Sequence, residues 1–252
     1  MSLPVYFVMM ALIIAHRGAS GESPENTLAA VQRAIDLESD FVEIDIHYSG
    51  DGEMIVIHDA TVERTTSGKG VVSEMTLADI KRLDAGSWFN SRFAEEKVPT
   101  LEEVLQLVRP SSSKLLIEIK EGNGLPEDFA GKLLGAIEEH GMQSRVIVQS
   151  FDHSAVKQVG AVATEIPTAA LIGEETPDPV GETKAAGAEI LAIRHTLATL
   201  ELIKKTHDSG LRFFVWTVDD PATIRRMLEW GVDAVISNYP DRVREVAMLL
   251  SP

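Results

Sequence analysis

Short runs of β-branched and other apolar residues alternate with amphipathic stretches along the whole chain. This alternation is typical of strand–helix units that build a parallel sheet. The pattern predicts eight strands, which begin near Ala11, Phe41, Lys114, Arg145, Pro167, Glu189, Arg212 and Asp233. It predicts helices at Asn26–Glu38, Leu101–Val108, Pro126–His140, His153–Val159, Pro179–Ala186, Leu200–Ser209, Pro221–Trp230 and Pro240–Leu249.

Residues at the borders of these helices fit the assignment. Pro221 and Pro240 stand in the first turn of two helices, where a missing backbone N–H costs little, and glycines follow other helices. Eight strand–helix units in 252 residues predict one α/β domain, a (β/α)8 TIM barrel. A doubly wound open sheet is the alternative that the same pattern allows.

The predicted strands are evenly spaced except at one place. The second and third strands begin 73 residues apart, whereas the other intervals run from 21 to 31 residues. Residues 60–98 fill this interval with polar turns and one short helical pattern, Leu77–Leu83. Because they are too few to bury a core alone, we expect an insertion at the barrel mouth within the single domain.

Composition and charge narrow the class of protein. The formal net charge is -16, and so acidic a chain repels nucleic acid and anionic membranes, so we expect neither as a main partner. The chain has no cysteine, which excludes disulfides and thiolate chemistry and is compatible with a cytoplasmic location. The apolar run Leu3–Ala15 is shorter than the roughly 20 residues of a membrane helix, so we expect no stable membrane insertion. Its second half is interpreted as a buried first strand.

Acidic side chains occupy one face of the second predicted strand. After Phe41, apolar residues alternate with Glu43 and Asp45, so the two carboxylates share a face. In a barrel the apolar face meets the helices and the acids point inward near the end of the strand where catalytic groups collect. Confined carboxylates repel each other, and a divalent cation compensates them. The alternative is an exposed edge strand with solvated acids.

A hairpin is predicted to bring His58 to the same place. The stretch Ser49–Gly52 is a turn signal, and a further strand follows it. If Tyr48 pairs with Glu53 across this turn, Glu43 pairs with His58 and the two share a face. A slip of one residue removes this argument, and a hydrogen-bonded structural histidine is then the alternative.

The third predicted strand repeats the acidic pattern. Glu118 and Lys120 share one face, as a further oxygen ligand and as a point charge for a phosphate. A surface ion pair is the alternative. Three carboxylates without cysteine suit a hard cation, Mg²⁺ or Ca²⁺, better than zinc.

The tripeptide His16-Arg17-Gly18 directly follows the apolar end of the first predicted strand. An arginine can grip a phosphate with two hydrogen bonds, and a glycine lets the backbone approach a ligand closely. Its place at the end of the strand is what marks the tripeptide as a candidate for chemistry.

The order and spacing of these motifs resemble the glycerophosphodiester phosphodiesterase family along nearly the whole chain. The family has a (β/α)8 barrel with an insertion after the second strand, which fits the long interval. The matching motifs are A-H-R-G at 15–18, P-E-N-T at 24–27, E-I-D at 43–45, S-x-D-G at 49–52, I-H-D at 57–59, R-T-T-S-G-x-G at 64–70, V-P-T-L-x-E at 98–103, I-E-I-K at 117–120, V-W-T-V at 215–218 and S-N-Y-P-D at 237–241.

The resemblance implies a complete set of site residues. It comprises a histidine acid/base pair, three carboxylates for one divalent metal ion, Mg²⁺ or Ca²⁺, two cations on the phosphate and one aromatic pocket wall. The acid/base pair is His16 and His58, and the metal ligands are Glu43, Asp45 and Glu118. Arg17 and Lys120 contact the phosphate. Trp216 is the pocket wall, for which a core position is the alternative.

The sequence indicates no catalytic role for several other polar residues. Pro24–Thr27 is interpreted as a helix start, and Gln149–Phe151 ends a strand without a clear role. His47 is treated as structural, and no role is assigned to His140, His153, His195 or His207.

The resemblance implies hydrolysis of a small-molecule glycerophosphodiester to glycerol 3-phosphate and an alcohol, through a cyclic phosphate. It does not say which histidine is the acid. Alternatives are a related barrel phosphodiesterase that acts on lysophospholipid or phosphoinositide head groups, a non-catalytic phosphoester-binding barrel, and a sugar-phosphate isomerase. We expect the insertion at 60–98 to shape the pocket around the leaving group.

Overall fold

A computed structural model describes residues 11–121 and 125–250. Most of the apolar run Leu3–Ala15 therefore lies outside the described residues, and its last part forms the first strand. In the described part of the chain, nine strands form one sheet. They are β1 (Leu12–Ala15), β2 (Phe41–Tyr48), β3 (Met54–Val56), β4 (Lys114–Ile119), β5 (Val146–Ser150), β6 (Thr168–Ile172), β7 (Ile190–Arg194), β8 (Arg212–Trp216) and β9 (Ala234–Ser237).

Eight of these strands close into a barrel. Their order is β1-β9-β8-β7-β6-β5-β4-β2, and β1 also pairs with β2, so no edge is left open. All pairings between them are parallel, whereas β3 is added to β2 as an antiparallel hairpin. The predicted (β/α)8 barrel is confirmed, each strand begins within one residue of its predicted start, and the open sheet is wrong.

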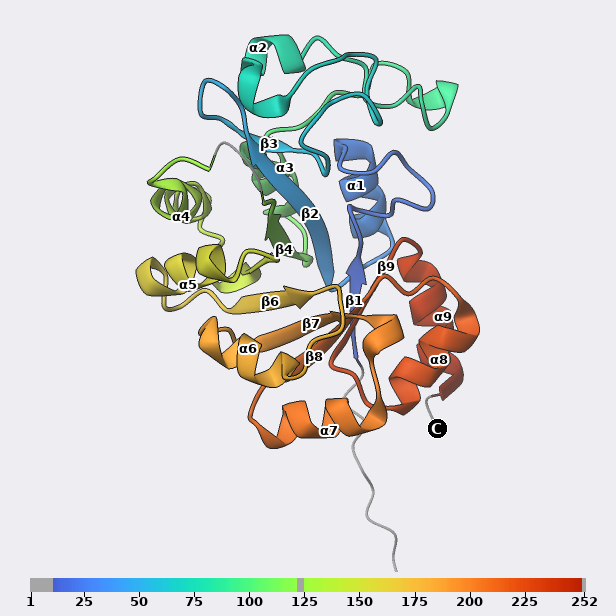
Figure 1. The fold of residues 1–252 in the computed structure, drawn as a ribbon. Helices are drawn as coiled ribbons and strands as arrows, with labels where there is room; N and C mark the ends of the chain where they lie inside the picture. The colour runs from blue at the N-terminus through green and yellow to red at the C-terminus, as the bar shows by residue number, and fades with distance from the viewer. Residues whose placement is uncertain (1–10, 122–124, 251–252) are drawn as a thin grey trace, which may run out of the picture.

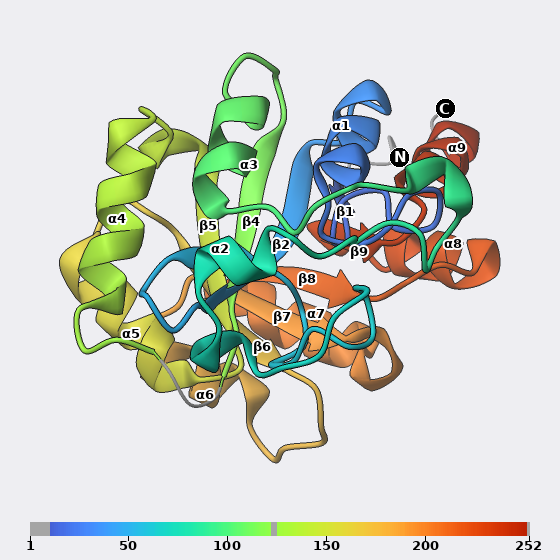
Figure 2. The same ribbon diagram turned by 90° about the horizontal axis from the view of Figure 1, so that it is seen from above.

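Helices surround this barrel, as Figures 1 and 2 show. Local signals set their ends: Thr100 and Glu103 form a reciprocal capping box at one, and Pro221 begins another after the capping Asp220. None of the described helices is long and apolar enough to cross a membrane. They are α1 (Leu28–Asp36), α2 (Leu77–Ile80), α3 (Leu101–Val108), α4 (Phe129–Glu139), α5 (His153–Val162), α6 (Pro179–Ala185), α7 (Leu200–Asp208), α8 (Pro221–Glu229) and α9 (Pro240–Leu250).

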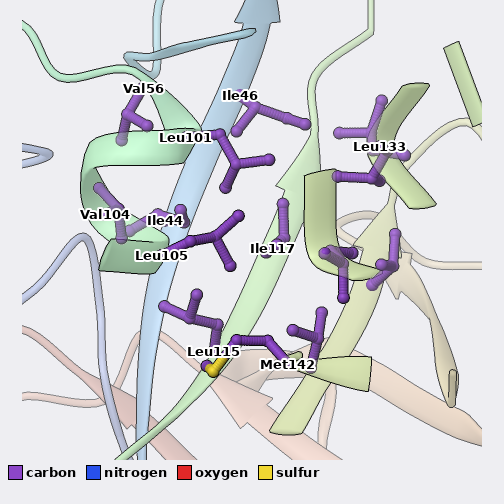
Figure 3. Packing of buried hydrophobic residues seen from close by; sticks show 14 of the residues in the cluster. Ile44, Ile46, Val56, Leu101, Val104, Leu105, Leu115, Ile117, Leu133 and Met142 are labelled. Carbon is purple, nitrogen blue, oxygen red and sulfur yellow. The ribbon is translucent and has the colours of Figure 1, made fainter. Parts of the chain in front are cut away.

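Strand alternation divides the core into an outer and an inner compartment. On the outer face of β2, Ile44 and Ile46 belong to the cluster that Leu101 and Leu105 of α3 complete (Figure 3). The inner compartment draws on all eight barrel strands and fills the axis, so the polar inward residues are left at the carboxyl ends of the strands. Its fully or nearly buried members are Ile14, Phe41, Leu116, Ile147, Ala169, Leu171, Ile190, Ala192, Phe214, Ala234 and Ile236.

The insertion follows the second barrel strand, as predicted, and lies above β2 and β3 in Figure 1. It contains α2 and two 3-10 turns, η1 (Val72–Glu74) and η2 (Ser91–Phe93). Its buried side chains, among them Val72 and Ile80, share one small cluster with Ile55 of β3. The insertion is therefore anchored on the β2–β3 hairpin.

Candidate active site

Three carboxylates lie together at the carboxyl end of the barrel. Glu43 and Asp45 are 1% and 0% exposed, and Glu118 stands beside Asp45 in the register of β2 and β4. One oxygen from each of the three lies within 4.8 Å of the others. The edge-strand alternative is wrong, because β2 lies between β1 and β4 and both of its acids are buried.

Two cations partly neutralise this cluster. The backbone N–H of Arg17 donates to Glu43 Oε2 at 2.8 Å, and the side-chain Nε of Arg17 lies 3.3 Å from Asp45 Oδ2. Lys120 Nζ lies 2.9 Å from Asp45 Oδ1 and donates to Glu118 Oε1 at 2.5 Å. The five side chains thus place three acidic groups beside two cations.

Burial and mutual repulsion separate the three carboxylates in their pKa values. Burial, together with Asp45 and Glu118, raises the pKa of Glu43 well above its ordinary value. Burial and the Asp45 charge raise the pKa of Glu118 to about 7. Burial also opposes the charge of Asp45, but Lys120 and Arg17 outweigh it and hold the pKa of Asp45 below its usual range.

The donor set fits a hard divalent cation. Glu43 Oε1 is buried and has no hydrogen-bond partner in the described part of the protein. An unpaired buried oxygen costs about 1–3 kcal/mol, and a cation between the carboxylates would satisfy it. The set consists of carboxylate oxygens, the ligands that Mg²⁺ and Ca²⁺ prefer.

His16 follows β1 and is backed by a neutral amide. Its Nδ1 lies 2.7 Å from Asn238 Oδ1, and the Asn238 amide donates through Nδ2 to Asp219 Oδ2 at 2.6 Å. Because Asp219 orients the amide, its oxygen faces His16, so Nδ1 carries the proton and Nε2 keeps a lone pair. Burial and the Arg17 charge lower the pKa of His16 to about 4, so the ring is neutral at pH 7.

His58 is backed by a carboxylate. Its Nδ1 lies 2.6 Å from Asp59 Oδ1, and Arg64 donates to the other oxygen of Asp59 at 2.6 Å. Burial lowers the pKa of His58, while the charge of Asp45 and the hydrogen bond to Asp59 oppose that shift. The side chain is 32% exposed and lines the same cavity as Glu118.

The predicted hairpin register is wrong by one residue. Tyr48 pairs with Met54 and not with Glu53, so Glu43 and His58 are not a cross-strand pair. His58 still reaches the cavity, because β3 ends at Val56 and the chain has left the hairpin before it.

The stretch Pro24–Thr27 does more than start a helix. Thr27 caps α1 as predicted, by accepting from Ala30 N at 3.2 Å. Asn26, however, donates to Asp45 Oδ2 at 2.7 Å, and its own Oδ1 accepts the Asp45 N–H at 3.2 Å. A helix cap needs only Thr27. The polar residues Glu25 and Asn26 before it were therefore the one feature of the sequence that could have indicated a role in the site.

Glu25 joins the site through two arginines. It accepts from Arg17 Nη1 at 2.8 Å and from both Nη atoms of Arg64 at 2.8 and 2.9 Å. The contact with Arg64 spans 39 residues, so the sequence pattern gave no sign of it.

A cavity of about 860 Å³ opens beside the carboxylates. Its lining includes His58, Glu118 and Lys120, together with Phe151 and the loop 173–176 after β6. In the described part of the chain, the insertion contributes Ala60 to this lining. Most of the wall therefore comes from the strand ends and loops of β4 to β7.

Trp216 lies on an adjoining cavity with His16, Arg17 and Gln149. Its ring meets Phe151 edge to face, with 5.5 Å between the ring centroids. Gln149 is 2% exposed, and its Oε1 has no hydrogen-bond partner among the described residues. The structure thus adds this glutamine to the residues that surround the carboxylates.

The remaining histidines fall into two groups. His47 and His153 line the large cavity, but each ring Nε2 is held by a backbone carbonyl, at 3.0 and 3.1 Å. His140, His195 and His207 do not line it.

Gly18 is required by the approach of two backbones. It has φ +78°, and a Cβ there would lie 2.5 Å from the carbonyl carbon of Ala30. Gly18→Ala should therefore lower the free energy of unfolding by at least about 1–3 kcal/mol, as measured by urea denaturation. Gly131→Ala is the control: this α4 glycine has open space around it, so alanine should stabilise by about 0.5–1 kcal/mol. Equal effects of the two changes would contradict the packing described for Gly18.

Comparison with known proteins agrees with this arrangement. Residues 16–242 match the sequence profile of the glycerophosphoryl diester phosphodiesterase family. A glycerophosphodiester phosphodiesterase from Caldanaerobacter subterraneus is 39% identical over 92% of this chain and 96% of its own length.

Solved structures show the same likeness. An Oleispira antarctica phosphodiesterase in complex with the product sn-glycerol-3-phosphate superposes with a TM-score of 0.89 at 29% identity, covering 94% of this chain and 96% of that one. Glycerophosphodiester phosphodiesterase from Agrobacterium tumefaciens gives 0.82 at 30% identity, covering 94% of this chain and all of the other. The match of profile, relatives and barrel extends over nearly the whole chain, which is therefore an enzyme of the glycerophosphoryl diester phosphodiesterase family.

Proposed function

We propose that this protein hydrolyses glycerophosphodiesters to glycerol 3-phosphate and an alcohol, with a divalent metal ion and two histidines. The observation that carries the proposal is the pair of histidines, His16 and His58, placed at one carboxylate cluster with different partners behind their rings. The product complex of the Oleispira relative supports the substrate class.

Glu43, Asp45 and Glu118 would hold the metal ion, with Mg²⁺ or Ca²⁺ as the candidates. When bound, the ion polarises the phosphoryl group and stabilises the charge that develops on its oxygens. Arg17 and Lys120 lie against the same carboxylates, so they are placed to add hydrogen bonds to a phosphate held there. Trp216, at the carboxyl end of β8, would bound the substrate pocket.

The two histidines divide the proton transfers between them. The lone pair on His16 Nε2 accepts the proton of the glycerol 2-hydroxyl, whose oxygen attacks phosphorus and forms a cyclic phosphate. His58 Nε2 donates a proton to the departing alcohol, because Asp59 stabilises the imidazolium form of this ring. Water then opens the cyclic phosphate with the two roles exchanged.

A direct assay tests the proposal. We expect glycerol 3-phosphate to be released from glycerophosphocholine with Mg²⁺ or Ca²⁺ present, and release to stop when a chelator is added. Choline release from lysophosphatidylcholine tests the lysophospholipid alternative, because that cleavage leaves lysophosphatidate and no free glycerol 3-phosphate. No release from the choline, ethanolamine or glycerol esters with either ion would contradict the proposed function.

Metal binding should release protons near neutral pH. Glu118 has its pKa raised to about 7 and that of Glu43 is raised as well, so at lower pH the ion must displace protons from them. Metal affinity should therefore fall on acidification below pH 7, by up to about tenfold per pH unit for each proton displaced. Calorimetry in buffers of different ionisation enthalpy measures the proton count. A binding enthalpy independent of the buffer at pH 6 would contradict the ligand assignment.

A further inference from the structure

Arg64 lies in the insertion and contacts two carboxylates at once. It donates from Nε and Nη2 to the two oxygens of Asp59, at 2.6 and 3.0 Å. It donates from Nη1 and Nη2 to the two oxygens of Glu25, at 2.8 and 2.9 Å. Both contacts are forked, a geometry that the planar guanidinium provides and a lysine cannot.

Each of these carboxylates touches a different part of the candidate site. The Asp59 oxygen that accepts from Arg64 Nη2 is also the one that meets His58 Nδ1 at 2.6 Å. The Glu25 oxygen that accepts from Arg64 Nη2 also accepts from Arg17 Nη1 at 2.8 Å. Arg64 is therefore linked to His58 through Asp59 and to Arg17 through Glu25.

The contact fixes Asp59 in position and in charge. A carboxylate beside a histidine can rotate, and it loses its effect on the ring if it turns away or gains a proton. Arg64 occupies both oxygens of Asp59, and its hydrogen bond, with that of His58, holds the pKa of Asp59 well below its usual range. The ring of His58 then keeps its proton on Nδ1 and presents Nε2 to the cavity.

We infer that Arg64 is a positioning residue for the reaction, and that it acts through Asp59 on the proton transfer by His58. This inference rests on the proposed function, in which His58 protonates the leaving alcohol. It gives the insertion a role in catalysis, separate from the cavity wall to which it contributes Ala60.

Two esters that differ in their leaving group distinguish a role of Arg64 in proton transfer from a merely structural role. An alkoxide such as that of choline needs a proton to depart, whereas p-nitrophenolate does not. Arg64→Met should lower kcat for glycerophosphocholine by about 10–100-fold, the usual effect of losing such a supporting contact, with little change in KM. The first-turnover release of p-nitrophenolate from the glycerophospho-p-nitrophenyl ester should fall much less. Equal losses on both esters, or no loss, would overturn the inference.

Two further variants keep the comparison interpretable. Arg82→Met removes another arginine of the insertion, one that is 76% exposed and pairs with Asp79, and both rates should stay at the wild-type value. Arg64→Lys keeps the charge but not the fork, and it should show a loss on glycerophosphocholine with the same dependence on the leaving group. If it matched wild type on that ester, charge alone would account for the effect and the positioning role would be wrong.

A spectroscopic readout does not depend on turnover. In the wild-type protein, the short contact with Asp59 should give the His58 Nδ1–H a downfield proton resonance that exchanges slowly with water; His58→Gln assigns it. Arg64→Met should shift or remove this signal, and Arg82→Met should not. An unchanged signal in Arg64→Met would refute the inference even if the wild-type protein hydrolysed neither ester, a result that would separately contradict the proposed function.

Discussion

Replacing His58 by glutamine should lower kcat for glycerophosphocholine by about 10²–10⁴-fold without unfolding the protein. The side chain is 32% exposed, and its ring hydrogen bond is to Asp59, which Arg64 also holds. The change therefore removes a proton donor without emptying a packed site. Steady-state rates of glycerol 3-phosphate release and a thermal melt measure the two effects.

A second histidine–aspartate pair provides the control. His207 Nε2 lies 2.8 Å from Asp233 Oδ2, with similar exposure, but it does not line the large cavity. His207→Gln should leave kcat unchanged. If His58→Gln kept a rate near that of the wild type, or if both variants lost activity equally, the proposed role of His58 would be wrong.

His16→Gln distinguishes the base from the acid. His16 is proposed to take a proton from the nucleophile, so a better leaving group should not restore the rate of this variant. In His58→Gln, the first-turnover release of p-nitrophenolate from the p-nitrophenyl ester should be restored in part, because this leaving group departs without a proton. The reverse pattern would exchange the two assignments.

The fold was predictable because its signals are local. Most barrel strands are apolar runs, apolar residues alternate with acids in β2, and many helices have their own capping residue, as α3 has in Thr100 and α8 in Asp220. The inward direction of Glu43 and Asp45 follows from alternation alone, once β2 lies inside a closed barrel.

The hairpin register was not predictable, because distant residues set the length of its turn. Asp51 accepts the backbone N–H of Leu77, 26 residues away, and Ser49 Oγ donates to the same carboxylate. Glu53 closes this turn on Ser49: its N–H donates to Ser49 Oγ, and its carbonyl accepts from the Ser49 N–H, both at 2.9 Å. The extra turn residue moves the pairing by one position, a shift that the local sequence does not specify.

The supporting contacts of the site were missed for the same reason. Glu25 meets Arg64 across 39 residues, and His16 meets Asn238 across 222. Motifs predicted the residues that are proposed to contact substrate or metal. The residues that hydrogen-bond to these could not be predicted from the sequence, because only the closed barrel brings them together.

Loss of charge at two neighbouring carboxylates should change the stability of the metal-free protein by very different amounts. Glu43→Gln should leave the free energy of unfolding nearly unchanged, because burial and Asp45 already favour the protonated form, which glutamine resembles. Asp45→Asn should lower it by about 3–5 kcal/mol, because it leaves Lys120 and Arg17 buried without their shared partner. Urea denaturation in the presence of chelator measures both, with Asp79→Asn on the surface as a control within about 0.5 kcal/mol of wild type.

Added metal should then separate wild type from both variants. An ion that binds the folded state alone stabilises the wild-type protein by about 2.7 kcal/mol at a hundred times its Kd. Glu43→Gln and Asp45→Asn should lose most of this gain and most of the turnover, since each lacks one charged ligand of the three. If Mg²⁺ or Ca²⁺ stabilised Glu43→Gln as much as wild type, Glu43 would not be a ligand. If Glu43→Gln destabilised the metal-free protein as much as Asp45→Asn does, Glu43 would carry its charge without the ion, because only an ionised Glu43 would lose a stabilising partner on that change.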